Sequence, residues 1–113
     1  MNWLPLTDPA QIEAALAGSQ GRTIAFFKHS TRCSISKMAL MFLEEDWDAQ
    51  SPLVAEWYFV DILAHRPVSN QLAERLQETH ESPQLLLVRD GECIYEASHN
   101  EIKADRIEAF LRG

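Results

Sequence analysis

Cysteine, glycine and proline are all scarce in this sequence: its 113 residues include 2 Cys, 4 Gly and 5 Pro. Two cysteines are too few for a disulfide scaffold, and so few glycines and prolines argue against a fibrous or disordered chain. No stretch approaches the roughly 18 consecutive apolar residues of a membrane span. These absences leave an ordinary globular chain, and we predict one domain over residues 1–113.

Basic residues are also few, because 10 Lys and Arg face 17 Asp and Glu, which gives a net charge of −7. This balance argues against nucleic acid as a partner. The first residues contain neither the basic region nor the apolar run of a signal peptide, and nothing predicts a membrane partner. We therefore expect a cytoplasmic protein, in a reducing compartment where both cysteines are free thiols.

Strand and helix signals alternate from end to end. Continuous apolar runs predict buried strands at 22–28, 57–60 and 84–89, and Asp90-Gly91 predicts a hairpin into an alternating strand, 92–97. Residues 9–17, 35–47, 67–79 and 104–111 have helical periodicity, and an extended piece near residues 3–6 precedes them. The order β-α-β-α-β-α-β-β-α is that of an α/β, thioredoxin-like fold, in which a mixed central sheet is flanked by helices.

Cys33 follows the strand 22–28 and precedes the strongest helical pattern, in which Ile35, Met38, Ala39, Phe42, Leu43 and Trp47 form one apolar stripe. A helix N-terminus favours an anion such as a thiolate, because its first N–H groups have no partner inside the helix. Residues 14–43 contain no Asp or Glu but include Arg22, Lys28, Arg32 and Lys37. We therefore expect a locally basic environment and a Cys33 pKa below the usual 8.5 or so of a free thiol.

Ser36 stands where a dithiol oxidoreductase of this fold carries its second cysteine, so the motif is Cys-x-x-Ser. Ser36 cannot form an internal disulfide, but a single thiolate can still attack a mixed disulfide and wait for a second thiol to release it. Pro83 precedes the strand 84–89, as the cis-proline of thioredoxin-like proteins does. In that fold the backbone of the preceding residue, here Ser82, can pair with an extended substrate.

Other residues with chemical potential have simpler interpretations. Cys93 is predicted to share one strand face with Tyr95 and Ala97, and a buried cysteine usually acts as a small hydrophobe. The four histidines fit no zinc spacing with either cysteine, so we expect no metal site. His29 could tune the thiolate, but we interpret it as a loop histidine in water.

Four segments together resemble the YtxJ-like monothiol bacilliredoxins: FKHSTRCSIS at 27–36, HRPVSN at 65–70, HESPQ at 80–84 and ASH at 97–99. This resemblance implies a protein of the bacillithiol system, with Cys33 removing bacillithiol from mixed disulfides on client proteins. It implies no bound cofactor, bacillithiol as co-substrate, and bacillithiolated clients as partners. Family members often carry Pro directly after the cysteine, where this chain has Ser34. We expect the following residues to contact the substrate: Thr31, Arg32, Ser34, Ser36, Ser82 and Pro83.

Two alternatives stay open. One is a glutaredoxin-like protein that binds an iron–sulfur cluster through Cys33 and a small thiol, although no further ligand stands nearby in the sequence. The other is a thioredoxin-fold interaction module without thiol chemistry, which the missing second cysteine motivates.

Overall fold

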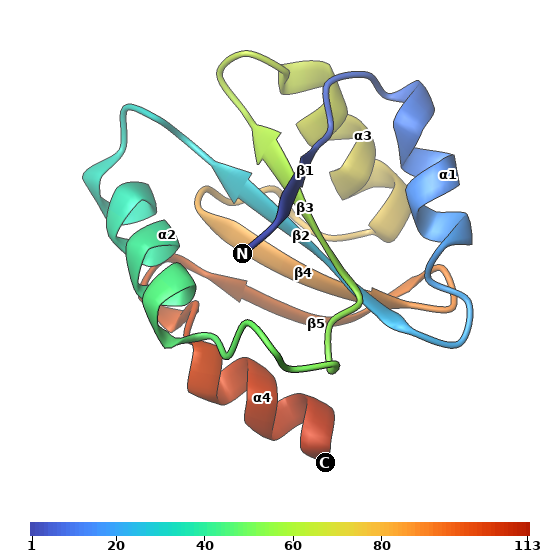
Figure 1. Ribbon diagram of the computed structural model, residues 1–113. Helices are drawn as coiled ribbons and strands as arrows, with labels where there is room; N and C mark the ends of the chain where they lie inside the picture. Colours follow the sequence, from blue (N-terminus) through green and yellow to red (C-terminus); the bar gives the residue numbers. More distant parts are fainter.

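The computed structural model describes all 113 residues, and its elements follow the predicted order with one 3-10 turn added before the last helix (Figure 1). The elements are β1 (Trp3–Pro5), α1 (Ala10–Ala17), β2 (Thr23–His29), α2 (Ser34–Asp46), β3 (Glu56–Asp61), α3 (Arg66–Leu76), β4 (Gln84–Arg89), β5 (Glu92–Ser98), the 3-10 turn η1 (His99–Glu101) and α4 (Ala104–Arg112).

One five-stranded sheet has the strand order β1-β3-β2-β4-β5. β1, β3 and β2 are parallel, whereas β4 is antiparallel to β2 and β5 is antiparallel to β4. Helices α1 and α3 cover one face of the sheet and α2 and α4 cover the other (Figure 1). The predicted mixed sheet flanked by helices is confirmed.

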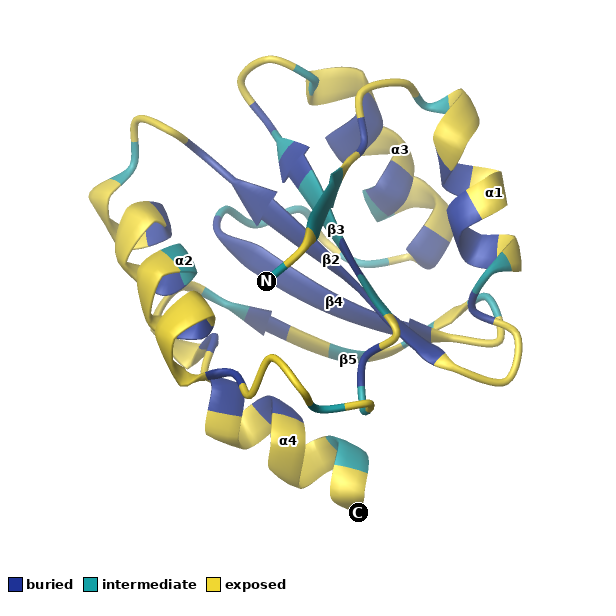
Figure 2. Ribbon diagram, in the orientation of Figure 1, coloured by how far each residue is buried: buried dark blue, intermediate teal, exposed yellow.

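Each face of the sheet has its own hydrophobic core. A cluster of 13 buried residues joins the sheet to α1 and α3, and a second cluster of 13 joins it to α2 and α4. We call these sides the α1/α3 face and the α2/α4 face. β2 is buried along its whole length, as the continuous apolar run predicted, and Figure 2 shows it as the dark centre of the sheet.

Local signals explain several element ends. The Asp8 carboxylate accepts a hydrogen bond from the Ala10 N–H at 2.9 Å, so it caps the start of α1. Asp90 and Gly91 both have positive φ, 53° and 76°, as the predicted tight hairpin requires. α3 ends at Leu76 rather than at residue 79, because Gln77 adopts the left-handed conformation with φ 56°.

The predicted faces of β5 are wrong for Cys93. Leu87 pairs with Tyr95 but Val88 pairs with Cys93, so a β-bulge lies between them. The extra residue shifts the alternation and places Cys93 on the α1/α3 face, while Tyr95 and Ala97 pack on the α2/α4 face.

No helix in the structure combines the length and apolar character needed to cross a membrane.

Candidate functional site around Cys33

Cys33 lies at the junction that the sequence predicted, immediately before the first residue of α2. Its backbone N–H donates to the Ser30 carbonyl at 3.2 Å, and its own carbonyl accepts from the Lys37 N–H at 3.0 Å. The residue is only partly buried, and no acidic side chain lies in the first turn of the helix. The thiol therefore stands at the positive end of α2 without a carboxylate in that turn to oppose a thiolate.

Ser36 is a fully buried residue and not a surface group. Its Oγ accepts a hydrogen bond from the Ser30 N–H at 3.0 Å and lies 2.7 Å from Nδ1 of His29. The hydroxyl thus joins the end of β2, the loop before Cys33 and the first turn of α2. We revise our expectation of a substrate contact at Ser36, because this side chain has no exposed surface and its partners are inside the protein.

His29 is also not the solvated loop histidine that we expected. It is the last residue of β2, only 5% exposed, with its ring against Phe27 and Phe59. Burial lowers the pKa of His29 from its usual value, with Asp61 and Lys37 as opposing smaller influences. The neutral ring is therefore favoured, and its Nδ1 can accept a hydrogen bond from the Ser36 hydroxyl.

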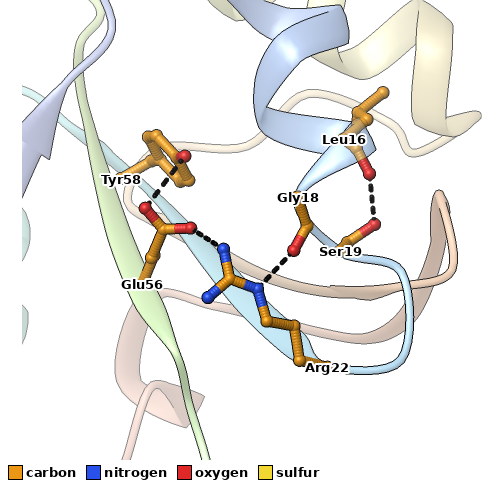
Figure 3. Close-up of polar contacts among 6 residues, drawn as sticks. All are labelled: Leu16, Gly18, Ser19, Arg22, Glu56 and Tyr58. Carbon is orange, nitrogen blue, oxygen red and sulfur yellow. Dashed lines mark hydrogen bonds and ion pairs between the residues drawn. The ribbon is translucent and has the colours of Figure 1, made fainter.

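The predicted basic environment of Cys33 is reduced to two of the four cations. Arg22 stands at the start of β2, at the far end of the strand, where it binds the Gly18 carbonyl and the Glu56 carboxylate (Figure 3). Lys28 points to the α1/α3 face, because side chains alternate along a strand. Arg32 and Lys37 remain near Cys33, and both are exposed.

Lys28 belongs to a polar cluster on the α1/α3 face. Its Nζ donates to the Ser69 carbonyl at 3.0 Å and lies 3.3 Å from Nδ1 of His80, which also lies 3.1 Å from the Ser69 Oγ. No carboxylate pairs with this fully buried amine. Burial, together with the charge of Arg66, lowers the pKa of Lys28 to about 8, and burial is also the main cause that lowers the pKa of His80. The only signal of this cluster in the sequence is a lysine at the end of a strand predicted to be buried.

Ser82 and Pro83 form the second part of the site, and the peptide bond between them is cis, as the resemblance implied. Lys28 at the end of β2 pairs with Gln84 at the start of β4, so the Ser82–Pro83 turn and the loop before Cys33 lie at the same edge of the sheet. The Gln84 amide supports this turn by donating to the Thr79 carbonyl and to Glu96, each at 2.9 Å. Ser82 Oγ is buried without a hydrogen-bond partner.

The structure thus brings most of the expected site residues to one edge. Thr31, Arg32 and Ser34 are exposed on either side of Cys33, and Ser82 and the buried Pro83 form the turn that leads into the neighbouring strand β4. The exception is Ser36, which supports the loop from beneath.

Cys93 has the properties of a structural residue. It packs against the core of the α1/α3 face, and its Sγ hydrogen-bonds to the Tyr95 carbonyl at 3.4 Å. Burial raises the pKa of the Cys93 thiol to about 11. At neutral pH almost none of it is the reactive thiolate.

The sequence matches the family of monothiol bacilliredoxins, BrxC, over residues 4–107. The chain belongs to the monothiol bacilliredoxin family. This places it among thiol oxidoreductases of the thioredoxin fold, in agreement with the resemblance seen in the sequence.

Solved structures agree on the fold. An oxidoreductase candidate with a thioredoxin fold has a TM-score of 0.77 at 24% identity, covering 98% of this chain and 94% of its own. Thioredoxin of Fasciola hepatica has a TM-score of 0.71 at 18% identity, covering 96% and 95% of the two chains. Thioredoxin f2 of Chlamydomonas reinhardtii has a TM-score of 0.72 at 16% identity, covering 98% and 94%. At these identities the similarity shows the fold alone.

Proposed function

We propose that this bacilliredoxin removes bacillithiol from mixed disulfides on cytoplasmic client proteins, with Cys33 as the attacking residue. The observation that supports it most directly is the position of Cys33 at the start of α2, partly exposed, inside a chain of the monothiol bacilliredoxin family. A helix N-terminus stabilises the thiolate, and the thiolate is the nucleophile in disulfide exchange.

The first step is an exchange without net oxidation. The Cys33 thiolate attacks the bacillithiol sulfur of the mixed disulfide, a new disulfide forms between Cys33 and bacillithiol, and the client sulfur leaves as a thiolate that takes a proton from water. A second small thiol, such as free bacillithiol, then attacks the bacillithiol sulfur on Cys33. This attack restores the Cys33 thiolate and produces a small-molecule disulfide.

The protein itself supplies no thiol for the second step. The residue three positions after Cys33 is Ser36, and Cys93 packs on the opposite face of the sheet from α2. Release of bacillithiol from Cys33 therefore needs an external thiol, which supports a monothiol cycle. No bound cofactor takes part in either step.

Thr31, Arg32, Ser34 and the Ser82–Pro83 turn are the residues that we propose for contact with the substrate. Thr31, Arg32 and Ser34 surround Cys33 on the surface. Arg32 supplies a positive charge beside the reacting sulfur, where it would favour the carboxylates of bacillithiol. The backbone of Ser82 would pair with the extended client chain.

Transfer of the small thiol tests this proposal. Reduced protein is mixed with a bacillithiolated client and followed by intact mass. We expect one bacillithiol on the wild type and on Cys93→Ser, and none on Cys33→Ser. Equal labelling of Cys33→Ser would exclude the mechanism. Parallel reactions with glutathionylated and coenzyme A-modified client measure the preference for bacillithiol, which we expect to react fastest.

Neither alternative has a supporting observation in the structure. No group of three or more His, Cys, Asp or Glu side chains is arranged to hold a metal ion, so a cluster at Cys33 would need its other ligands from outside the chain. An interaction module without thiol chemistry would not need a cysteine at the helix start. Iron content of protein purified without oxygen, and partner binding by Cys33→Ala, would detect these two functions.

A further inference from the structure

Helix α2, which begins after Cys33, has more apolar side chains than the core buries. The predicted stripe held six residues, but only Ala39, Leu43 and Trp47 of that stripe are buried. The others are on the solvent side together with Met41, and Figure 2 shows this side of α2 as largely exposed. The exposed side chains and their exposed fractions are Ile35 42%, Met38 52%, Met41 46% and Phe42 44%.

Three of these side chains line a groove between α2 and the segment that runs through η1 into α4. A hollow of about 120 Å³ lies next to Ile35, Met38 and Phe42, and a second of about 510 Å³ continues toward Asp46. Both hollows share Phe42, Ile102 and Lys103, so they form one groove. We call it the α2–α4 groove.

The groove begins at the reactive site. Ile35, two residues after Cys33, stands at one side of its entrance, and His99 stands at the other. The His99 N–H donates to the Pro83 carbonyl at 3.1 Å, so the entrance also adjoins the cis-proline turn. A chain that places its sulfur against Cys33 can therefore continue directly into the groove.

The far end of the groove is acidic. Asp46, Asp105 and Glu108 line it against a single cation, Lys103. Glu108 is already paired with Arg112 at 2.9 Å, but neither Asp46 nor Asp105 has an ion-pair partner. The groove thus changes along its length from apolar beside Cys33 to negative at the end of α2.

We propose that the α2–α4 groove binds an extended segment of the client protein, with an apolar side chain near the modified cysteine and a Lys or Arg farther along. This inference rests on the proposed function and adds a sequence preference to it. From Cys33 to Asp46 the helix rises about 20 Å at 1.5 Å per residue. An extended chain covers that distance in about six residues, at about 3.3 Å each.

The chemistry of the groove favours such a client over a second copy of this chain. A chain with a net charge of −7 repels its own copies, and an acidic groove attracts a basic segment. Met38 lines the groove and is flexible and polarisable, which suits a surface that accepts different apolar side chains. A redoxin that serves several clients needs this tolerance.

Two bacillithiolated peptides test the preference. Both carry Leu three residues after the modified cysteine. They differ only at the sixth residue after that cysteine, which is Lys in one peptide and Glu in the other. For the wild type at low salt we expect kcat/KM about threefold to tenfold higher for the Lys peptide, with a smaller difference at high salt. Asp46→Lys should remove or reverse the difference, and Phe42→Ser should slow both peptides. Glu74→Lys, an exposed acid on α3, is the matched control and should behave as the wild type.

A further substrate tests the proposed function separately from the groove inference. It is the mixed disulfide of bacillithiol with 2-mercaptoethanol, which is too short to enter the groove. If the wild type does not turn it over, the proposed function fails. If all variants turn it over equally but the peptides show no dependence on charge, the groove inference is overturned and the proposed function stands. Sedimentation gives the remaining outcome: a wild-type dimer that Phe42→Ser dissociates would make the groove an interface between copies and overturn the inference.

Discussion

The two faces of the sheet contain nearly the same set of residue types and differ in chemistry. Each has a core cluster of 13 residues and a cysteine on that side, together with a hydrogen-bonded serine–histidine pair near the end of β2. The pair on the α2/α4 face is Ser36–His29, and the pair on the α1/α3 face is Ser69–His80. Only Cys33, on the α2/α4 side, lies at a helix N-terminus.

Position explains the difference. Cys33 lies outside the core cluster at the start of α2, whereas Cys93 packs against its cluster from β5, close to the turn of the β4–β5 hairpin. The α1/α3 face also buries a cation, Lys28, which has no counterpart among the buried residues of the other face. Burial works against ionisation in both cases, since it raises the pKa of the Cys93 thiol and lowers the pKa of the Lys28 amine.

The largest expected difference between the faces is in thiol reactivity. At pH 7 a Cys93 pKa of about 11 leaves roughly one thiolate in ten thousand, against a few per cent for an ordinary exposed thiol. We expect iodoacetamide to modify Cys33 at least about 100-fold faster than Cys93 in the native protein. Peptide mass spectrometry measures both rates, and in guanidinium the two rates should converge. Comparable native rates would remove the contrast.

The buried lysine gives the next effect, on stability. Because the folded-state pKa of about 8 lies below the usual 10.5, the unfolded chain keeps a proton that the folded chain releases between these values. The free energy of unfolding should therefore rise as the pH is raised from about 8 to about 10.5, by about 3 kcal/mol at 1.4 kcal/mol per unit.

Urea unfolding of the wild type and Lys28→Met across this range measures the Lys28 contribution. The variant should lack the rise and at pH 7 should be as stable as the wild type or more so, because a buried unpaired charge is replaced by an apolar side chain. Lys103→Met, which removes an exposed lysine, is the control and should keep the rise. A rise that survives in Lys28→Met would show that another group causes it.

These residues also show which parts of the structure were predictable. The element order and the position of Cys33 at the start of α2 depend on local patterns that the sequence contains, and the cis bond at Pro83 was expected from the resemblance to thioredoxin-like proteins. The positive surroundings of Cys33 were overestimated because Arg22 and Lys28 are close in sequence only. Arg22 lies at the opposite end of β2 from the site, and the Lys28 side chain lies on the opposite face of the sheet.

Two other errors have physical causes that periodicity does not contain. The bulge in β5 adds one residue to the strand, and a simple alternation cannot reveal it. The apolar stripe of α2 was predicted correctly as a pattern, but a pattern does not say how much of it the sheet covers. The remainder, including Met38 and Phe42, became the groove.

Cys93 should affect stability in the direction opposite to Lys28. Its folded-state pKa of about 11 lies above the usual 9.0, so between these values the unfolded chain loses a proton that the folded chain keeps. Stability should fall over this range by about 2 kcal/mol, less than the full 1.4 kcal/mol per unit because Cys93 is partly exposed. Comparing Lys28→Met with Lys28→Met/Cys93→Ala isolates the effect. If the free energy of unfolding of the two variants depended on pH in the same way, the predicted effect of Cys93 would be contradicted.

The two serine–histidine pairs offer the finest comparison. Ser36→Ala leaves the Ser30 N–H and His29 Nδ1 without their partner and should cost about 1–2 kcal/mol in urea unfolding. Ser69→Ala should cost less, because its backbone carbonyl still holds Lys28 and His80 Nδ1 keeps Lys28 as a neighbour.

Exchange with a small bacillithiol mixed disulfide separates the pairs by function. Ser36 ties the loop before Cys33 to both β2 and α2, so Ser36→Ala should slow the reaction several-fold, as loss of positioning does. Ser69→Ala acts on the other face and should leave the rate unchanged. Measuring the exchange rate at a pH where both variants are fully folded distinguishes a positioning defect from a loss of folded protein. A positioning defect keeps Ser36→Ala slower than the wild type at that pH. Equal rates for Ser36→Ala and the wild type would make Ser36 a purely structural residue. The buried hydroxyl would then account for the stability of the loop and not for the reactivity of the thiol above it.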